Sequence, residues 1–352
     1  MNIFELLNKA VELKASDLHL TLGSQPVMRI AGSLLRIGDI ALSCEDTSNL
    51  ISQLLTDNQL QQLNSWGELD FAYSSSDEGR FRVNAYKQND SYALAIRIIS
   101  KNIYTIEDLG LPPILKELSM KQRGLILVTG PTGSGKSTTL AAMIDYINKN
   151  RQSHILTLED PIEYQHKHAK SIVNQREIGR DSNSFGNALR AALRQDPDVI
   201  LVGEMRDLET ISTALTAAET GHLVLSTLHT IGAAKTIDRI TDVFPPHQQQ
   251  QIRVQLATVL EAIISQQLLP TIEGNKRVAA EEIMIANPAV KNLIREGKAF
   301  QIQNLIQTGS KLGMKSMDYS LSQLYNQMQI SKETAFENCI DRDMLERLIM
   351  GS

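Results

Sequence analysis

The sequence has little of what marks secreted, membrane-spanning or metal-binding proteins. Only two of its 352 residues are cysteines, Cys44 and Cys339, and without a C-x-x-C pair they give neither a zinc site nor a disulfide framework. No apolar run approaches the roughly 18 residues that a bilayer span requires. The first residues lack a basic segment followed by an apolar one, so nothing directs the chain to secretion. We therefore expect a soluble, cytoplasmic protein with no transmembrane segment.

The sequence also lacks an excess of positive charge. It has 35 Lys and Arg against 40 Asp and Glu, which gives a net charge of −5. A broad basic face is therefore not expected, and nucleic acid is not an expected partner. At roughly 150 residues per domain, the length predicts two or three domains. Hydrophobic residues make up 42% of the chain, which is enough for a sizeable core.

A glycine-rich loop at residues 130–137 is the most informative segment that is present. It reads Gly-Pro-Thr-Gly-Ser-Gly-Lys-Ser and fills every fixed position of the pattern G-x-x-x-x-G-K-[ST]. It lies between the apolar run 125–128 and a segment of helical pattern at 138–144, which is the context this motif needs. An incidental glycine-rich turn is the alternative, and both flanks argue against it. The loop therefore predicts a site for a nucleoside triphosphate.

Each part of this loop has a chemical reason. Glycines let successive backbone N–H groups face the phosphates, and the positive end of the following helix adds to them. Lys136 is expected to reach the β- and γ-phosphate oxygens, and the Ser137 hydroxyl to hold Mg²⁺. The predicted nucleotide-binding residues are Gly130, Pro131, Thr132, Gly133, Ser134, Gly135, Lys136, Ser137 and Thr138.

The pattern of the chain changes at three places. Short strand-like and helical runs over 1–100 predict a small α+β domain, followed by a turn-rich linker over 101–118 that contains Gly110 and two prolines. Strands and helices alternate over 119–280, which implies a parallel sheet flanked by helices. The pattern over 281–352 is mostly helical. The predicted fold class is therefore α/β, with a smaller domain in front of the core.

Two local patterns in the first domain lead to specific expectations. Leucine and isoleucine spacing predicts a helix from about Ser43 to Asn64. Alternation over 80–86 places apolar residues on one face of a strand and Arg80, Arg82 and Asn84 on the other. Phosphoryl transfer is favoured by a cation beside the γ-phosphate, and Arg82 and Arg97 are our candidates for that role. The alternative for each arginine is a surface salt bridge.

Carboxylates follow two of the predicted core strands. Glu204 comes after the apolar run 199–202, and ligands of open α/β sheets collect at the carboxyl ends of strands. Gly203 stands where an aspartate usually organises Mg²⁺, so Glu204 would orient metal-bound water or the attacking water. A solvated loop acid is the alternative. Glu163 ends a second acidic segment, at 159–163, which could polarise water, although such clusters are often solvated loops or helix caps.

Two histidines, His222 and His229, bracket the apolar run 223–228. Neither pairs with a cysteine, and no H-E-x-x-H spacing occurs, so zinc is not expected. His229, at a strand end, could sense the γ-phosphate by a hydrogen bond, while His222 fits a structural role.

Taken together and in this order, these segments resemble the secretion ATPases of type II and type IV systems, and among them the type IV pilus retraction ATPases. The resemblance runs nearly from end to end. The matching segments are Ala15-Ser-Asp-Leu-His-Leu, the phosphate loop, an aspartate box at 158–163, a Walker B region at 189–207 and a histidine box at 221–230.

The resemblance implies a fold and a set of site residues. The fold is an N-terminal α+β, PAS-like domain, then a RecA-like P-loop ATPase domain with a helical C-terminal region. ATP and Mg²⁺ are the implied cofactors, with Ser137 and Glu204 near the metal. Glu163 and Glu204 are the implied important acids, His229 contacts the nucleotide site, and Arg82 and Arg97 reach the phosphates from the N-terminal domain.

The function that the resemblance implies is a hexameric motor that hydrolyses ATP to power pilus retraction and twitching motility. It would act on an inner-membrane platform protein, from the cytoplasmic side at the pilus base. The alternatives are an accessory retraction ATPase, a type II secretion or pilus extension motor, and a scaffold without turnover. The extension ATPases carry a longer N-terminal region and a four-cysteine zinc insert, which this chain lacks. Segments 289–296 and 307–318 resemble retraction ATPases, with Val290-Lys291 in place of the usual Ile-Arg.

Overall fold

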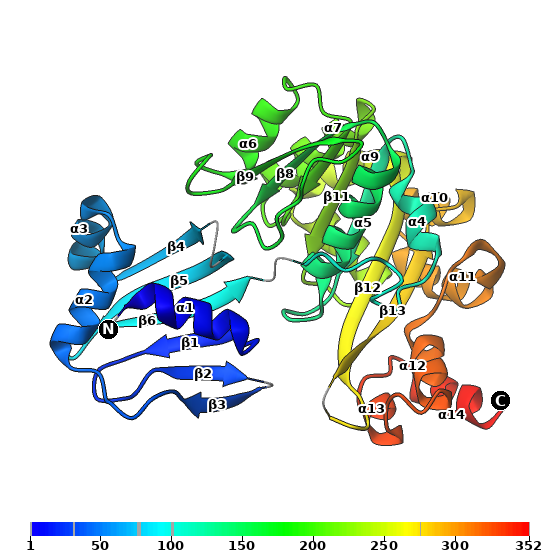
Figure 1. Cartoon of the computed structure of the whole chain (residues 1–352). Coiled ribbons are helices and arrows are strands. Elements are labelled where there is room, and N and C mark those ends of the chain that lie inside the picture. The colour runs from blue at the N-terminus through cyan, green and yellow to red at the C-terminus, as the bar shows by residue number, and fades with distance from the viewer. Residues whose placement is uncertain (1, 31, 76–78, 100–101, 275, 352) are drawn as a thin grey trace. The chain divides into compact units, whose positions relative to one another are not determined.

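The computed structural model describes residues 2–30, 32–75, 79–99, 102–274 and 276–351 (Figure 1). The chain forms two compact units, Met1–Asn102 and Ile103–Ser352. Lys101, where the expected linker begins, lies outside the described residues. Asn102 ends the first unit, and residues 103–118 of that linker belong to the second unit, whose core includes Ile106 and Leu115. The four-part division of the chain stays a prediction.

The first unit contains a six-stranded antiparallel sheet in the order β3-β2-β1-β6-β5-β4. Alternation along β5 buries Phe81, Val83 and Ala85 and exposes Arg82, as the sequence predicted, but Arg80, expected beside Arg82, is buried at 8% exposure. The elements of this unit are α1 (Ile3–Glu12), β1 (Asp17–Leu20), β2 (Val27–Ile30), β3 (Ser33–Arg36), α2 (Cys44–Leu54), α3 (Asp57–Trp66), β4 (Glu68–Ser75), β5 (Gly79–Gln88) and β6 (Ser91–Ile99).

The single helix predicted from Ser43 to Asn64 is wrong, because the chain forms two helices there. Leu55 is extended, with φ −93° and ψ 142°. The Thr56 hydroxyl accepts the Gln59 N–H, and the Gln59 side chain accepts the Thr56 N–H. This capping box starts α3 as a new helix. Apolar spacing continues across the break, so periodicity alone did not reveal it.

The second unit is built on a seven-stranded sheet in the order β13-β12-β7-β11-β10-β8-β9. All its pairings are parallel except that of β12 with β13. The central strands β7, β10 and β11 are buried along their whole length, which explains their continuous apolar sequences. The strands are β7 (Gly124–Thr129), β8 (His154–Glu159), β9 (Ile172–Glu177), β10 (Val199–Val202), β11 (Leu223–Leu228), β12 (Leu260–Pro270) and β13 (Arg277–Ile285).

Helices cover both faces of this sheet (Figure 1). One face packs against α4 and α5, and the other against α6 to α11. The last three helices form a smaller core with β12 and β13. The helices are α4 (Ile114–Ser119), α5 (Lys136–Asn150), α6 (Phe185–Ala192), α7 (Leu208–Glu219), α8 (Ala233–Asp242), α9 (Pro246–Val259), α10 (Pro288–Arg295), η1 (Ala299–Gln301), α11 (Ile302–Thr308), η2 (Ser310–Leu312), α12 (Met317–Asn326), α13 (Lys332–Glu337) and α14 (Arg342–Met350).

Within the described ranges, none of these helices combines the length and the apolar character needed to cross a bilayer.

Candidate functional site

The glycine-rich loop joins the end of β7 to the start of α5, as the sequence predicted. Gly130, Gly133 and Gly135 have φ values of 140°, 79° and 88°, which residues with a side chain rarely adopt. Helix α5 begins at Lys136, so the N–H groups of its first turn have no partner within the helix. Such a loop and helix start form a site suited to phosphate.

The Lys136 ammonium lies within this loop. Its Nζ donates to the carbonyl oxygens of Gly130 and Pro131, both at 2.9 Å, and the residue is only 8% exposed. Burial lowers the pKa of Lys136, while the negative charges of Glu204 and Glu163 act in the opposite direction. Both predicted acids therefore act electrostatically on the phosphate-loop lysine.

The Ser134 hydroxyl is a second buried polar group in the loop. The Ser134 Oγ has no hydrogen-bond partner in the described part of the chain. A buried hydroxyl of this kind is costly unless something bonds to it. Together with the glycine conformations and Lys136, it fits a loop that holds a phosphate group.

Glu204 lies just beyond β10, where the ends of three strands are tied together. The Gly203 N–H donates to the Leu158 carbonyl at 2.7 Å, and the Thr227 hydroxyl donates to the Gly203 carbonyl at 2.6 Å. A Cβ at Gly203 would lie 3.1 Å from the Leu158 carbonyl oxygen. Glycine in place of the usual aspartate therefore allows β8 and β10 to approach closely at this point.

The Glu204 carboxylate has two partners. Its Oε1 lies 3.1 Å from His229 Nε2 and 2.6 Å from Arg206 Nε. The carboxylate raises the pKa of Arg206 through this hydrogen bond. The structure thus brings together Glu204 and His229, which the sequence proposed separately. It adds Arg206, an exposed arginine that no local pattern set apart from the others.

The acidic segment at 159–163 divides into a half-buried and an exposed part. Glu159 is half-buried, and its Oε1 accepts from the Thr157 hydroxyl at 2.6 Å and from Gln175 Nε2 at 3.1 Å. Burial raises the pKa of Glu159. Glu163 is exposed, and the next residue, Tyr164, shares a 2.9 Å hydrogen bond with Thr138 in the first turn of α5. This bond holds the segment beside the phosphate loop.

Arg82 and Arg97 lie in the first unit, directly opposite each other on β5 and β6. Asp17 is the next residue in this row across the sheet, and its Oδ1 lies 3.0 Å from Arg97 Nε. Arg29 follows on β2, with its Nε 3.9 Å from Asp17 Oδ2. The two predicted arginines are therefore neighbours in a row of three arginines and one aspartate.

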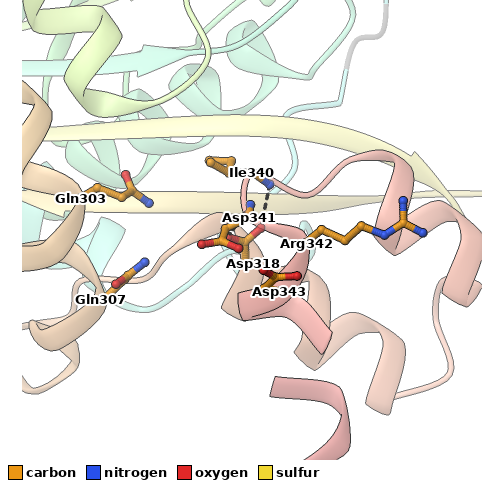
Figure 2. A pocket seen from close by; sticks show the side chains of 7 residues that line it. All are labelled: Gln303, Gln307, Asp318, Ile340, Asp341, Arg342 and Asp343. Atoms are coloured by element: carbon orange, nitrogen blue, oxygen red, sulfur yellow. Dashed lines mark hydrogen bonds between the residues drawn. The ribbon is translucent and has the colours of Figure 1, made fainter. Parts of the chain in front are cut away.

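A separate hollow of about 430 Å³ lies among α11, α12 and the start of α14 (Figure 2). It contains none of the predicted site residues. The Asp318 carboxylate accepts the N–H groups of Ile340 at 2.7 Å and Asp341 at 3.2 Å. Burial raises the pKa of Asp318. Asp318 therefore fixes the turn that leads into α14. The lining residues are Gln303, Gln307, Asp318, Ile340, Asp341, Arg342 and Asp343.

The phosphate loop is also closely packed from behind, which gives a first testable prediction. A Cβ at Gly130 would collide with the carbonyl oxygen of Gln266 and lie 2.7 Å from Ser134 Oγ. Gly130→Ala is expected to lower the free energy of unfolding by about 2–5 kcal/mol, through backbone strain and overpacking. Gly133→Ala is the matched control, because its φ is also positive but nothing lies within 4 Å of its Cβ position. Chemical denaturation of both variants should show the larger loss for Gly130→Ala, and equal losses would contradict the prediction.

Comparison with known proteins shows which proteins this chain resembles. A family model described as "Type II/IV secretion system protein" matches residues 2–339. The chain is 51% identical over 337 residues to the type IV pilus retraction ATPase PilT of Pseudomonas aeruginosa, covering 96% of this chain and 98% of that protein. It is 41% identical over 353 residues to the type IV pilus ATPase PilU of the same species, covering 100% of this chain and 92% of that protein.

Solved structures agree with these relationships. A crystal structure of the pilus retraction motor PilT with bound ADP matches with a TM-score of 0.93 and 51% identity, covering 99% of each chain. The Legionella pneumophila ATPase DotB matches with a TM-score of 0.81 and 30% identity, covering 99% of this chain and 95% of that one.

These findings confirm the predicted fold class, an N-terminal α+β domain followed by a RecA-like P-loop ATPase domain with a helical C-terminal region. They also confirm the resemblance to the type IV pilus retraction ATPases. The family model spans most of the sequence, and both relatives exceed 40% identity over nearly all of it. The chain therefore belongs to the family of type II/IV secretion system proteins.

Proposed function

We propose that this chain is an ATPase that binds ATP with Mg²⁺ and couples its hydrolysis to pilus retraction. The observation that carries the proposal is the position of Glu204, which lies 3.1 Å from His229 and acts electrostatically on Lys136 in the phosphate loop. A relative of 51% identity is a retraction motor whose crystal structure contains ADP. This likeness supports the same nucleotide and the same work for this chain.

The phosphate loop and the start of α5 bind the triphosphate. Backbone N–H groups of the loop and of the first turn of α5 face its oxygens, and Lys136 donates to the β- and γ-phosphates. Ser137, which is exposed at the first turn of α5, and Glu204 would hold Mg²⁺, the latter partly through water. Bound Mg²⁺ neutralises charge on the phosphates.

The acids act on water rather than on the phosphate. Glu204 orients the attacking water, and His229, whose Nε2 lies 3.1 Å from Glu204 Oε1, bonds the γ-phosphate. Glu163, exposed beside the same loop, is the second candidate for accepting the proton. Arg82 and Arg97 supply positive charge from the first unit to the phosphates of a site that closes during turnover. Six copies form the ring in which these sites open and close.

The motor acts on an inner-membrane platform protein, from the cytoplasmic side at the base of the pilus. Retraction is preferred to the accessory role because identity is 51% to PilT and 41% to PilU. Type II secretion and pilus extension are competing functions within the same family.

Direction is tested by deleting the gene in its own bacterium and counting surface pili by electron microscopy. We expect excess pili and loss of twitching, both reversed by the intact gene and not by a copy carrying Glu204→Gln. Excess pili mean that removal of pilin from the fibre has stopped. Cells without pili would contradict retraction and indicate an extension or secretion motor. Unchanged pilus number with residual twitching would indicate the accessory role.

A further inference from the structure

A buried glutamine from a distant strand lies directly behind the phosphate loop. Gln266, on β12, is 3% exposed and comes 132 residues after Ser134. Its Nε2 donates to the Ser134 carbonyl oxygen at 2.7 Å. Its Oε1 accepts from the Thr139 hydroxyl in α5, also at 2.7 Å. One side chain therefore bonds the loop on one side and the helix that follows it on the other.

The bond to Ser134 meets a specific need of a phosphate-binding loop. When the N–H groups of such a loop face the ligand, its carbonyl groups turn the other way. A carbonyl turned into the protein needs a donor, since a buried unpaired acceptor is costly. Gln266 supplies this donor. Because the Ser134 carbonyl can only accept, it requires the Nε2 end of the amide to face the loop, and the Thr139 hydroxyl donates to Oε1 at the other end.

The loop backbone also rests directly on this glutamine. A Cβ at Gly135 would lie 2.9 Å from Gln266 Nε2, and one at Gly130 would meet the Gln266 carbonyl oxygen. Strand β12 pairs with β7 up to Thr129, which is opposite Ser265, so the loop begins where the strand pairing ends. Gln266 is thus the first residue of β12 beyond this pairing, placed where the loop needs support.

We propose that Gln266 is a positioning residue that holds the phosphate loop in its nucleotide-binding conformation. It acts through the Ser134 carbonyl and the Thr139 hydroxyl and does not touch the nucleotide. The inference rests on the proposed function, because it assigns a determinant of ATP affinity to the same site.

The segment that follows His229 is held by side chains other than Gln266, so the proposed role of Gln266 is limited to the phosphate loop. The Gly232 N–H donates to Ser265 Oγ at 2.8 Å, and the Ala233 N–H donates to Glu282 Oε1 at 2.9 Å. These bonds hold the start of α8, just after His229, and none of them involves Gln266. Loss of the Gln266 amide should therefore loosen the phosphate loop and leave the contact between His229 and Glu204 in place.

The test uses the full chain with Gln266→Met, which keeps side-chain length and removes both polar atoms. The Kd for a fluorescent ADP analogue and the KM for ATP are expected to rise about tenfold, with kcat within about twofold of wild type. This pattern corresponds to a loss of binding shared by the ground state and the transition state. Gln266→Glu retains an acceptor for Thr139 but loses the donor to Ser134, and it should raise Kd at least as much.

Gln267→Ala is the matched control, because adjacent strand residues face opposite sides of the sheet. The Gln267 Nε2 makes a long, 3.4 Å bond to the Asn338 carbonyl. This variant should bind ADP like wild type. Thr139→Val provides a milder perturbation of the same amide and should raise Kd by about two- to threefold.

Thermal unfolding without nucleotide separates positioning from plain stability. A lower unfolding temperature of Gln266→Met with unchanged Kd and KM would overturn the inference, because the glutamine would then only stabilise the fold. A fall in kcat at unchanged KM would overturn it as well. A wild-type chain that neither binds nor hydrolyses ATP would instead remove the proposed function, and this inference with it.

Discussion

Glu204→Gln is expected to lower kcat for ATP hydrolysis by about 10²–10⁴-fold, the usual contribution of a positioned general base. The amide has the size of the carboxylate but cannot accept a proton from water. It can still bond to Arg206 and His229, so the strand ends should keep their geometry. Affinity for ADP should therefore stay near that of wild type. Phosphate release at saturating ATP, together with an ADP titration, measures both quantities.

Two further amide substitutions interpret that result. Glu209→Gln is the matched control, since Glu209 is exposed on α7 and pairs with Arg190 at 2.6 Å. It should leave kcat unchanged. Glu163→Gln tests whether Glu163 also takes part in accepting the proton. A loss of kcat as large as that of Glu204→Gln would give Glu163 a role in this step as well. Unchanged phosphate release from Glu204→Gln would refute the role of Glu204.

Lys136→Ala is expected to weaken ADP binding by about 10–100-fold, the equivalent of one or two charge-assisted hydrogen bonds. The lysine is held inside the loop by the carbonyl groups of Gly130 and Pro131, so the substitution removes a cation that is already in position. Its pKa is lowered by burial, which means that the folded chain holds this charge at a cost. Removing this charge should therefore not lower the unfolding temperature that is measured without nucleotide.

Isothermal titration of ADP into the purified variant measures the effect. Lys149→Ala is the matched control, because Lys149 lies at the other end of α5 and pairs with Asp145 at 2.7 Å. Binding by the control should match wild type. Wild-type affinity in Lys136→Ala would contradict the assignment of the loop as the phosphate site.

The sequence was sufficient for the parts of the site that depend on local pattern. The phosphate loop could be recognised from eight adjacent residues, and Glu204 and His229 from the apolar runs before them. The closeness of Glu204 and His229 follows from the parallel sheet, since strands β10 and β11 end at the same edge. The break at Thr56 was missed because apolar spacing continues through it, while capping depends on two side chains within one turn.

Contacts between distant segments could not be predicted. Nothing in Ser265-Gln266-Gln267 distinguishes the glutamine that supports the phosphate loop from the one beside it. That distinction depends on β12 lying next to β7, a neighbour relation that skips four strands in the sequence. The bond between Tyr164 and Thr138 is of the same kind. In the first unit, alternation identified Arg82, but only strand pairing placed Arg97 opposite it and Asp17 beyond.

The long sequence separation between Ser134 and Gln266 has a consequence for synthesis of the chain. A ribosome that adds about 5–20 residues per second needs on the order of 10 s to proceed from one to the other. During this interval the nascent chain carries a complete phosphate-loop sequence without the strand that supports it. If ATP binds as proposed, we expect it to bind the newly made core less tightly until β12 has been synthesised and has paired with β7. The support that Gln266 gives to the loop thus becomes available only after about three quarters of the chain has been made.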